Sequence, residues 1–488
     1  MCVFIMDQGH FCENCLKHVG ESYMQKAVRN LFLIFLFVSL FFLVRLHFYY
    51  APLIGEEGIF ADILMKHPQS PNFLLSGRID GQNIYHQPAH PIVMYYALDA
   101  MGNLFSPLIN TVSWLDDTEI TPLLRFLISL NQFAVFLGIG IVIILRKGFP
   151  LVIAVSILVA VAISPTAVIT SANLQLDGSI GVLMSGLFAM TLFYLSIFNP
   201  GNGFLGVVLF MVSFFLATGK QEWSIIALCA LLFAALYLFI FKYKKSAEFK
   251  TDVSMLLIVL SGLMAGNLFS YFLEPLSYLG GLKVLWSFSH ADKLLEGHFD
   301  LQKWIQLTNS RVRWICIPIA LAGISTLLVF NKLKRLKTVE VLLWFYGLGL
   351  LGAYFLSNWN TEPRYFAPSL VVLAITVILL LPSVTKFRLW IPITVVVFLM
   401  FLADGLFLFN NIVKKPQSPY FDVNKISLKS DEIAILTTAE AWNKLNIDFA
   451  NRDNGKIISE NFAKKYHKTL YPKNYVWWDE RSAENDKN

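Results

Sequence analysis

Charged residues are scarce in this chain. Only 15% of its 488 residues are Asp, Glu, Lys or Arg, whereas 56% are hydrophobic and the mean hydropathy is +0.59. So little charge with so much apolar material excludes an ordinary soluble domain and predicts a polytopic membrane protein. The net charge of +6 gives no indication of a nucleic-acid partner, because Lys and Arg gather in the cytoplasmic loops of such proteins.

Cysteine is also sparse, and the five cysteines do not form a disulfide framework. Two of them belong to His10-x-Cys12-x2-Cys15-x2-His18, which has the ligand types of a zinc site. Closed zinc sites usually pair two separated ligand couples, whereas these four share one short stretch, so a metal there stays open. Met24 is an alternative start that would remove this segment, and we expect no cleavable signal peptide.

No Gly-rich phosphate loop and no internal repeat stand out in the sequence. The absence of the loop agrees with a substrate that needs no nucleotide site. The sequence fixes no cofactor and leaves a divalent metal ion open.

Apolar runs predict an all-α bundle of about eleven transmembrane helices, each near the ~20 residues that cross a bilayer. The predicted spans are 31–48, 122–145, 149–169, 178–198, 204–218, 223–241, 253–272, 314–330, 339–357, 365–381 and 390–409. The chain then divides into a cytoplasmic segment 1–30, a transmembrane domain 31–409 and a small external segment 410–488. Strand-like patches such as 432–436 occur in the last of these.

Lys and Arg fall in alternate loops, which predicts a cytoplasmic N-terminus and, with an odd number of spans, an external C-terminus. The residues are Lys26, Arg29, Arg146, Lys147, Lys242, Lys244, Lys245, Lys250, Lys332, Lys334, Arg335, Lys337, Lys386 and Arg388. Short loops and the absence of a eukaryotic-type retention signal favour a bacterial inner membrane.

Two large loops are predicted on the outer side, 49–121 and 273–313. The first is net acidic, and apolar residues at helical spacing predict two surface helices within it, near 59–64 and 91–105.

Four charged signals from separate parts of the chain fall at outer helix ends. They are the acidic pair Glu56-Glu57, Asp177, Lys220 and Arg364. A carboxylate can accept the proton of an acceptor hydroxyl, and cations can hold a phosphate and stabilise the charge of its departure. This mixture indicates transfer of a group from a phosphate leaving group.

The same stretches carry a resemblance. Glu56-Glu57-Gly58-Ile59-Phe60-Ala61 resembles the Asp-Glu-Gly-x-Tyr-Ala stretch after the first span of GT-C fold glycosyltransferases, in particular the dolichyl- or polyprenyl-phosphate-mannose mannosyltransferases and the lipid A aminoarabinose transferases. Gln87-Pro88-Ala89-His90-Pro91, followed by Tyr95-Tyr96, is similar to the family's Lys-Pro-Pro stretch with its aromatic pair. Thr218-Gly219-Lys220 and Arg364-Tyr365-Phe366-Ala367-Pro368 are similar to its Lys-Gly and Arg-Tyr-x-x-Pro pieces.

The resemblance runs in the family's order from Leu31 to about Leu381. It implies an inverting transferase that takes a sugar from a polyprenyl-phosphate donor on the outer face and gives it to a lipid, glycan or protein. Glu56, beside Glu57, would be the general base, and Asp177 would orient the acceptor or a metal.

The resemblance also implies a set of substrate-binding residues, with the carrier phosphate held by its two cations. The set is Lys220, Arg364, Tyr365, His86, Gln87 and His90. The chain departs from the family in having Glu56 in place of Asp, and Gln87 or His90 near the position of the loop lysine.

Other interpretations compete with this one. The chain could be a transporter or flippase of a lipid-linked sugar, or a non-catalytic scaffold of an envelope assembly. Asp177 could simply cap a helix, and Lys220 and Arg364 could lie at the headgroup level. We expect Arg45 to extend toward the headgroups, while Asp404, in the last span, indicates either helix packing or a polar cavity. Which sugar and which acceptor take part stays open.

Overall fold

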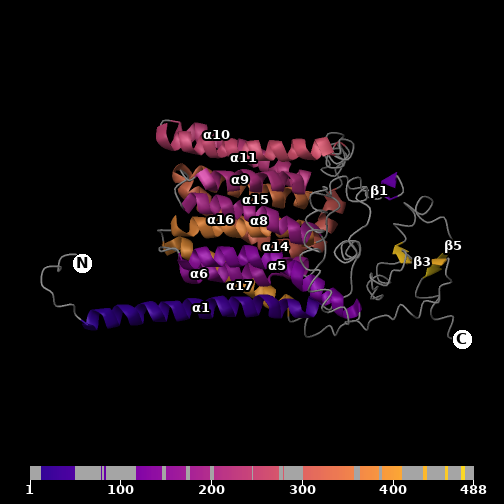
Figure 1. Cartoon of the computed structure of the whole chain (residues 1–488), viewed down its shortest axis with the longest axis horizontal. Helices are drawn as coiled ribbons and strands as arrows, with labels where there is room; N and C mark the ends of the chain where they lie inside the picture. Colours follow the sequence, from indigo (N-terminus) through magenta and orange to yellow (C-terminus); the bar gives the residue numbers. More distant parts are fainter. Residues whose placement is uncertain are drawn as a thin grey trace.

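The computed structural model describes residues 13–49, 78–79, 82–83, 117–145, 150–171, 176–197, 203–243, 246–273, 279, 301–356, 363–383, 387–408, 432–436, 457–459 and 474–478. Most of these residues lie in one helical bundle (Figure 1). Its helices are α1 (Glu13–Tyr49), α5 (Asp117–Leu145), α6 (Leu151–Ile163), α7 (Pro165–Ser171), α8 (Leu176–Ile197), α9 (Gly203–Gly219), α10 (Gln221–Lys242), α11 (Ser246–Leu273), α14 (Leu301–Lys332), α15 (Thr338–Leu356), α16 (Ala367–Leu380) and α17 (Phe387–Leu408).

Three short 3-10 helices join or extend these elements: η1 (Leu333–Arg335), η2 (Pro363–Tyr365) and η3 (Leu381–Ser383). The described strands are short. β1 (Arg78–Ile79) pairs with β2 (Gln82–Asn83), and β3 (Glu432–Leu436) lies between β4 (Ile457–Ser459) and β5 (Asn474–Trp478) in a parallel sheet. The strand-like patch at 432–436 is thus a strand. The predicted surface helices near 59–64 and 91–105 lie outside the described residues.

Seven of the described helices are long and apolar enough to cross a membrane, and the bent pair α6–α7 would make an eighth span. The predicted multi-pass membrane fold is therefore confirmed. Three further predicted spans coincide with shorter apolar helices, at Leu31–Leu46, Gly203–Gly219 and Ala367–Leu380. The count of about eleven spans stays a prediction.

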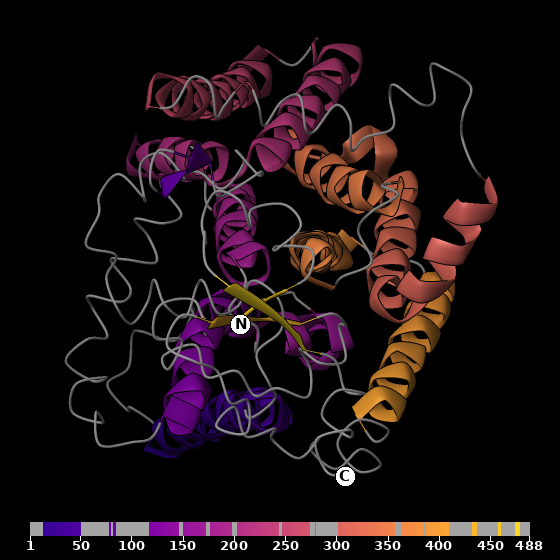
Figure 2. The ribbon, with the colours of Figure 1, turned by 90° about the vertical axis from the view of Figure 1, so that its right-hand side faces the viewer.

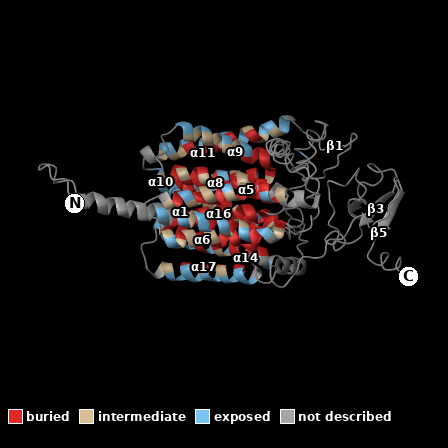
Figure 3. Cartoon of the chain, turned by 60° about the horizontal axis from the view of Figure 1, so that its bottom comes forward, coloured by how far each residue is buried: buried red, intermediate tan, exposed pale blue. Residues whose placement is uncertain are grey.

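The core of the bundle forms around α16, in which every residue is buried. This helix packs against α8, α14 and α15, and in the view along the helices it lies in the interior (Figure 2). The outward faces of peripheral helices such as α10, α11 and α17 expose large apolar side chains (Figure 3). Exposed Phe, Leu and Ile on such faces are suited to contact with lipid tails.

The bend between α6 and α7 measures 54° and follows from Ser164-Pro165. Proline has no backbone N–H to donate and its ring disfavours a continuous helix, so the helix ends before it. The Ser164 hydroxyl then accepts a hydrogen bond from the N–H of Ala167 at 3.2 Å, as an N-cap does. The sequence prediction of one unbroken span at 149–169 missed this break.

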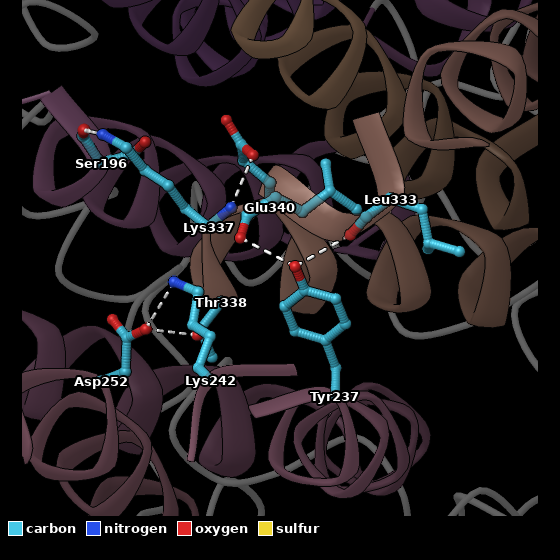
Figure 4. Close-up of polar contacts among 9 residues, drawn as sticks. Ser196, Tyr237, Lys242, Asp252, Leu333, Lys337, Thr338 and Glu340 are labelled. Atoms are coloured by element: carbon cyan, nitrogen blue, oxygen red, sulfur yellow. Dashed lines mark hydrogen bonds and ion pairs between the residues drawn. The ribbon is translucent and has the colours of Figure 1, made fainter. Parts of the chain in front are cut away.

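A polar clamp closes the end of the bundle at which α10 finishes (Figure 4). Lys242 Nζ lies 3.0 Å from Asp252 Oδ2, and the Thr338 hydroxyl donates to the same oxygen at 2.5 Å. Lys332 Nζ lies 3.0 Å from Glu340 Oε1.

Two further residues complete the clamp. The Tyr237 hydroxyl contacts the carbonyl oxygens of Leu333 and Leu336, at 3.0 and 2.9 Å. The Lys337 backbone N–H donates to Glu340 Oε2 at 2.8 Å, and its Nζ donates to the Ser196 carbonyl. These contacts join α8, α10, α11, α14, η1 and α15 and hold the helix ends together.

Candidate functional site

Three of the predicted substrate-binding residues lie within the described part of the chain, and the fold brings all three together. Lys220 precedes α10, whereas Arg364 and Tyr365 belong to η2, more than a hundred positions later. The Lys220 Nζ lies 5.1 Å from the centroid of the Tyr365 ring, and the Arg364 guanidinium carbon lies 4.9 Å from the same centroid. One aromatic ring therefore contacts both cations.

Lys220 owes its position to an unusually short connection. It is the single residue between α9 and α10, with an extended backbone (φ −157°, ψ 132°) that reverses the chain at this point. Its side chain is only 3% exposed. The Nζ lies 5.9 Å from the ring centroids of both Trp223 and Tyr354, in addition to Tyr365. A lysine so enclosed does not simply extend into the headgroups, as the alternative interpretation of this residue expects.

Glu222 is the charge partner of Lys220. Its Oε2 lies 2.8 Å from Lys220 Nζ and accepts a hydrogen bond from the Tyr354 hydroxyl at 2.9 Å. Neither Glu222 nor Tyr354 was among the site residues predicted from the sequence. In a sequence, an acidic residue in the first turn of a helix is normally explained by its favourable interaction with the helix dipole. The contact with Lys220 exists because Lys220 lies outside the helix, in an extended conformation that returns its side chain over the first turn.

Arg364 is also largely buried, with 8% of its surface exposed. The Tyr365 ring that it contacts packs in turn against Tyr354, with ring centroids 5.3 Å apart. A cation over an aromatic face gains electrostatic stabilisation, the more so when water is excluded. We name the six residues Lys220, Glu222, Trp223, Tyr354, Arg364 and Tyr365 the cation–aromatic cluster.

The first turns of α8 lie beside this cluster. At Gly181, an added Cβ would lie 2.6 Å from the Trp223 ring and 3.5 Å from Pro368 Cγ. η2 also packs against α7 and α8. Asp177 is the second residue of α8, one turn before Gly181, so its backbone lies at the same end of the bundle as the cluster. The side chain of Asp177 lies outside the described part.

Gln132 and Thr170 hold this end of α8. Gln132 Nε2 donates to Thr170 Oγ1 at 3.0 Å and to the Gly178 carbonyl at 3.2 Å. Gly178 approaches Thr170 so closely that an added Cβ would lie 3.0 Å from the Thr170 backbone oxygen. The turn that carries Asp177 is thus fixed by buried polar contacts from α5 and α7.

The remaining predicted site residues are not placed. Glu56, Glu57, His86, Gln87 and His90 lie outside the described residues. So do His10 and Cys12 of the possible zinc motif, and the side chains of Cys15 and His18. Within the described part of the chain, no group of three or more His, Cys, Asp or Glu side chains is arranged to hold a metal ion.

Arg45 corrects an expectation. It does not extend toward the headgroups but is fully buried, with its guanidinium carbon 3.5 Å from the centroid of the Phe41 ring. It donates to Ser171 Oγ at 2.5 Å and to the carbonyls of Phe41 and Ala162, both at 2.8 Å. Arg45 therefore joins α1 to both sides of the α6–α7 bend.

Asp404, on α17, is also fully buried, and neither carboxylate oxygen has a hydrogen-bond partner among the described residues. One turn away, Phe401 packs on the apolar group formed by Val44, Ile163 and Val168.

Chemically, the cluster brings two buried cations together, an arrangement that suits an anionic group. It holds two largely buried cations against aromatic rings, and Lys220 forms an ion pair with Glu222. Comparison with protein families finds no family model that matches this chain, and comparison with curated proteins finds no significant match.

Proposed function

We propose that this chain is a GT-C glycosyltransferase that moves a sugar from a polyprenyl-phosphate carrier to an envelope acceptor at the outer face of the membrane. The observation that carries the proposal is the meeting of Lys220 and Arg364 on the single ring of Tyr365. Cations that are buried together and come from distant segments are suited to holding a phosphate group. A binding site at the end of a lipid-exposed bundle is also suited to a donor that arrives through the bilayer.

In the proposed reaction, an acceptor hydroxyl attacks the anomeric carbon of the sugar and inverts it. The bond from that carbon to the phosphate oxygen breaks, and its electron pair stays on the phosphate. Glu56 takes the hydroxyl proton, and Asp177 orients the acceptor. Lys220 and Arg364 neutralise the charge that develops on the departing phosphate, which is where preorganised cations accelerate a reaction most.

A transporter of a lipid-linked sugar is the second candidate, and two observations favour it. Broken helices and intramembrane carboxylates are common in transporters. The α6–α7 pair is such a broken span, and Asp404 is a buried carboxylate without a hydrogen-bond partner in the described part of the chain. We favour the enzyme because the buried cations meet at a helix end.

One reconstitution experiment separates the candidates. The protein is placed in vesicles with a radiolabelled polyprenyl-phosphate sugar and an envelope extract as acceptor source. We expect label to appear in an extract component. Movement of label across the bilayer without transfer would instead identify a transporter. If the label is neither transferred nor transported, only the interpretation as a scaffold is left.

The same assay tests the cluster. Lys220→Ala and Arg364→Ala are each expected to lower kcat/KM about 10- to 100-fold, with part of the loss in KM, because a phosphate contact acts in both the ground and transition states. Lys334→Ala is the control, since Lys334 is exposed and belongs to η1, near the other end of α10. Equal activity of all three variants would place the phosphate elsewhere.

A further inference from the structure

Asp404 on α17 is a buried carboxyl group that the proposed reaction does not use. It is fully buried, and neither of its oxygens has a hydrogen-bond partner among the described residues. α17 lies at the edge of the bundle, where it packs on α6, α7 and α14 (Figure 3). Leu402 and Leu406, on either side of Asp404 in the sequence, are exposed on the outward face of this helix. Asp404 is thus turned away from the lipid and toward the bundle.

Asp404 continues a row of apolar contact residues. Ile393, Val397 and Met400 are buried, and their spacing places them on the same face of α17 as Asp404. An acid therefore occupies a position at which this face of the helix otherwise presents apolar side chains to the bundle.

The helices that α17 packs against offer Asp404 little charge. α6 and α7 consist of aliphatic residues with Ser, Thr and Pro, so neither carries a titratable side chain. On α14, Cys316 is exposed and Lys332 pairs with Glu340. The side chains of the other basic residues of α14 lie outside the described part of the chain; they are Lys303, Arg311 and Arg313.

α1 approaches the same region, since its Val44 belongs to the apolar group on which Phe401 packs. The titratable groups at this end of α1 are engaged elsewhere. Arg45 donates to α7 and to the α6 carbonyl before the bend, and the Tyr49 hydroxyl lies 2.8 Å from that of Ser129. The side chain of His47 lies outside the described residues. Within the described part, no cation pairs with Asp404.

These surroundings are unfavourable for a charge. An ionised carboxylate would lose its hydration here without gaining a partner, which costs far more than burying the same group in its neutral form. A carboxyl group that holds a proton can instead pack in the apolar row.

We propose that Asp404 is a proton-binding site, that its carboxyl group carries a proton at neutral pH, and that α17 packs on the bent α6–α7 pair only while the proton is held. The ligand is the proton alone, so the O–H bond of the acid is the only bond that forms or breaks. The site stands independently of the proposed function, because it uses none of the residues assigned to sugar transfer.

Infrared difference spectroscopy of the purified full-length protein tests the protonation. At neutral pH, the spectrum of the wild type minus that of Asp404→Asn is expected to contain the carbonyl stretching band of a protonated carboxyl group, which is distinct from carboxylate bands. Asp404→Glu keeps an acid and should keep a protonated band. Glu340→Gln is the matched control, because Glu340 is also buried but pairs with Lys332, so its removal should subtract carboxylate bands only.

Single cysteines on α17 test the packing. Val397→Cys lies on the buried face and Val395→Cys on the exposed face. In a cysteine-free protein at neutral pH, a lipid-soluble maleimide should label Val395→Cys but not Val397→Cys. When alkaline pH removes the protonated band, labelling of Val397→Cys should rise toward that of Val395→Cys at the same pH. It should stay low when Asp404→Asn is added, because the amide remains neutral.

Two results would overturn the proton site: a difference spectrum without the protonated band, or an Asp404→Asn variant that fails to fold while Asp404→Glu folds. Either would mean that the carboxylate is charged at neutral pH. Labelling of Val397→Cys that responds equally to pH with and without Asp404→Asn would overturn the link between the proton and the packing of α17. The reconstitution assay for sugar transfer is decided separately from all of these results.

Discussion

A single carboxylate is the residue on which the proposed chemistry depends most. If Glu56 is the base, Glu56→Gln keeps its size and hydrogen bonding but removes the proton acceptor. Turnover should then fall by about two to four orders of magnitude while carrier-lipid binding survives. A transfer assay together with a lipid-binding measurement on the same preparation checks both parts.

Glu57→Gln is the control for this prediction, with a milder loss expected because adjacent residues point in different directions. An inactive Glu57→Gln beside an active Glu56→Gln would move the base by one residue. Retained activity in both would refute a carboxylate base in the acidic pair.

For single residues, the sequence predicted those whose chemistry can be recognised from their type and their place at the end of an apolar run. Lys220 and Arg364 stand out as cations at the ends of apolar runs, and they do meet. Glu222 and Tyr354 could not be found in this way, because their roles depend on the extended backbone of Lys220 and on the packing of α15 against α10. Arg45 was misread, since nothing in an apolar run shows which carbonyl oxygens will lie opposite it.

Among the elements, the broken α6–α7 span depends on hydrogen bonds from another helix at its bend. Its bend interrupts regular helix hydrogen bonding in an apolar setting, where an unmet carbonyl is costly. Arg45 donates to the Ala162 carbonyl before the bend and to Ser171 after it. The charged side chain is thereby a structural part of the bend.

We therefore expect Arg45→Leu, which fills space but cannot donate, to lower the free energy of unfolding by about 1–3 kcal/mol. Thermal unfolding in detergent measures the loss. Leu46→Ala is the neighbouring control, because Leu46 is 52% exposed on the outside of α1. If Arg45→Leu unfolds like the wild type, Ser164 and Pro165 hold the bend without Arg45.

The bend itself had a sequence signal that the span prediction passed over. A Ser-Pro pair inside an apolar run combines an N-cap residue with a helix breaker. Hydropathy alone averages over such pairs, so it predicts that a segment enters the membrane but not that it changes direction there.

For the whole molecule, orientation in the membrane is the property that the outer-face site requires. The polar clamp and the cation–aromatic cluster lie at opposite ends of α10, which at 22 residues is about 33 Å long. Because the Lys- and Arg-rich loops are grouped with the clamp, we predict that the clamp is cytoplasmic.

Single cysteines in a cysteine-free background, probed in intact cells with a membrane-impermeant maleimide, test this orientation. We expect labelling at the external positions and none at the cytoplasmic ones; the external set is Asp80, Trp304 and Tyr420, and the cytoplasmic set is Lys244 and Arg335. The reverse pattern would invert the molecule and rule out an outer-face site.

The helical, multi-pass character of the chain was predictable because long apolar runs need no knowledge of their neighbours. Which helices touch was not, since any apolar helix can pack on another. The interior position of α16 and the approach of η2 to α7 and α8 depend on how the surfaces of the helices fit together, which cannot be read from the sequence.

The contact between Gly181 and Trp223 has a consequence for the protein's descent. The indole ring lies where a side chain on residue 181 would have to go, and it also lies over Gly219, where an added Cβ would be 3.2 Å away. A side chain on residue 181 must therefore displace the ring, whereas one on residue 219 needs the ring to shift by only a few tenths of an ångström; either change moves a ring that borders Lys220. Positions 181, 219 and 223 should therefore vary jointly among related sequences, because a change in this packing contact moves the ring that lies beside Lys220.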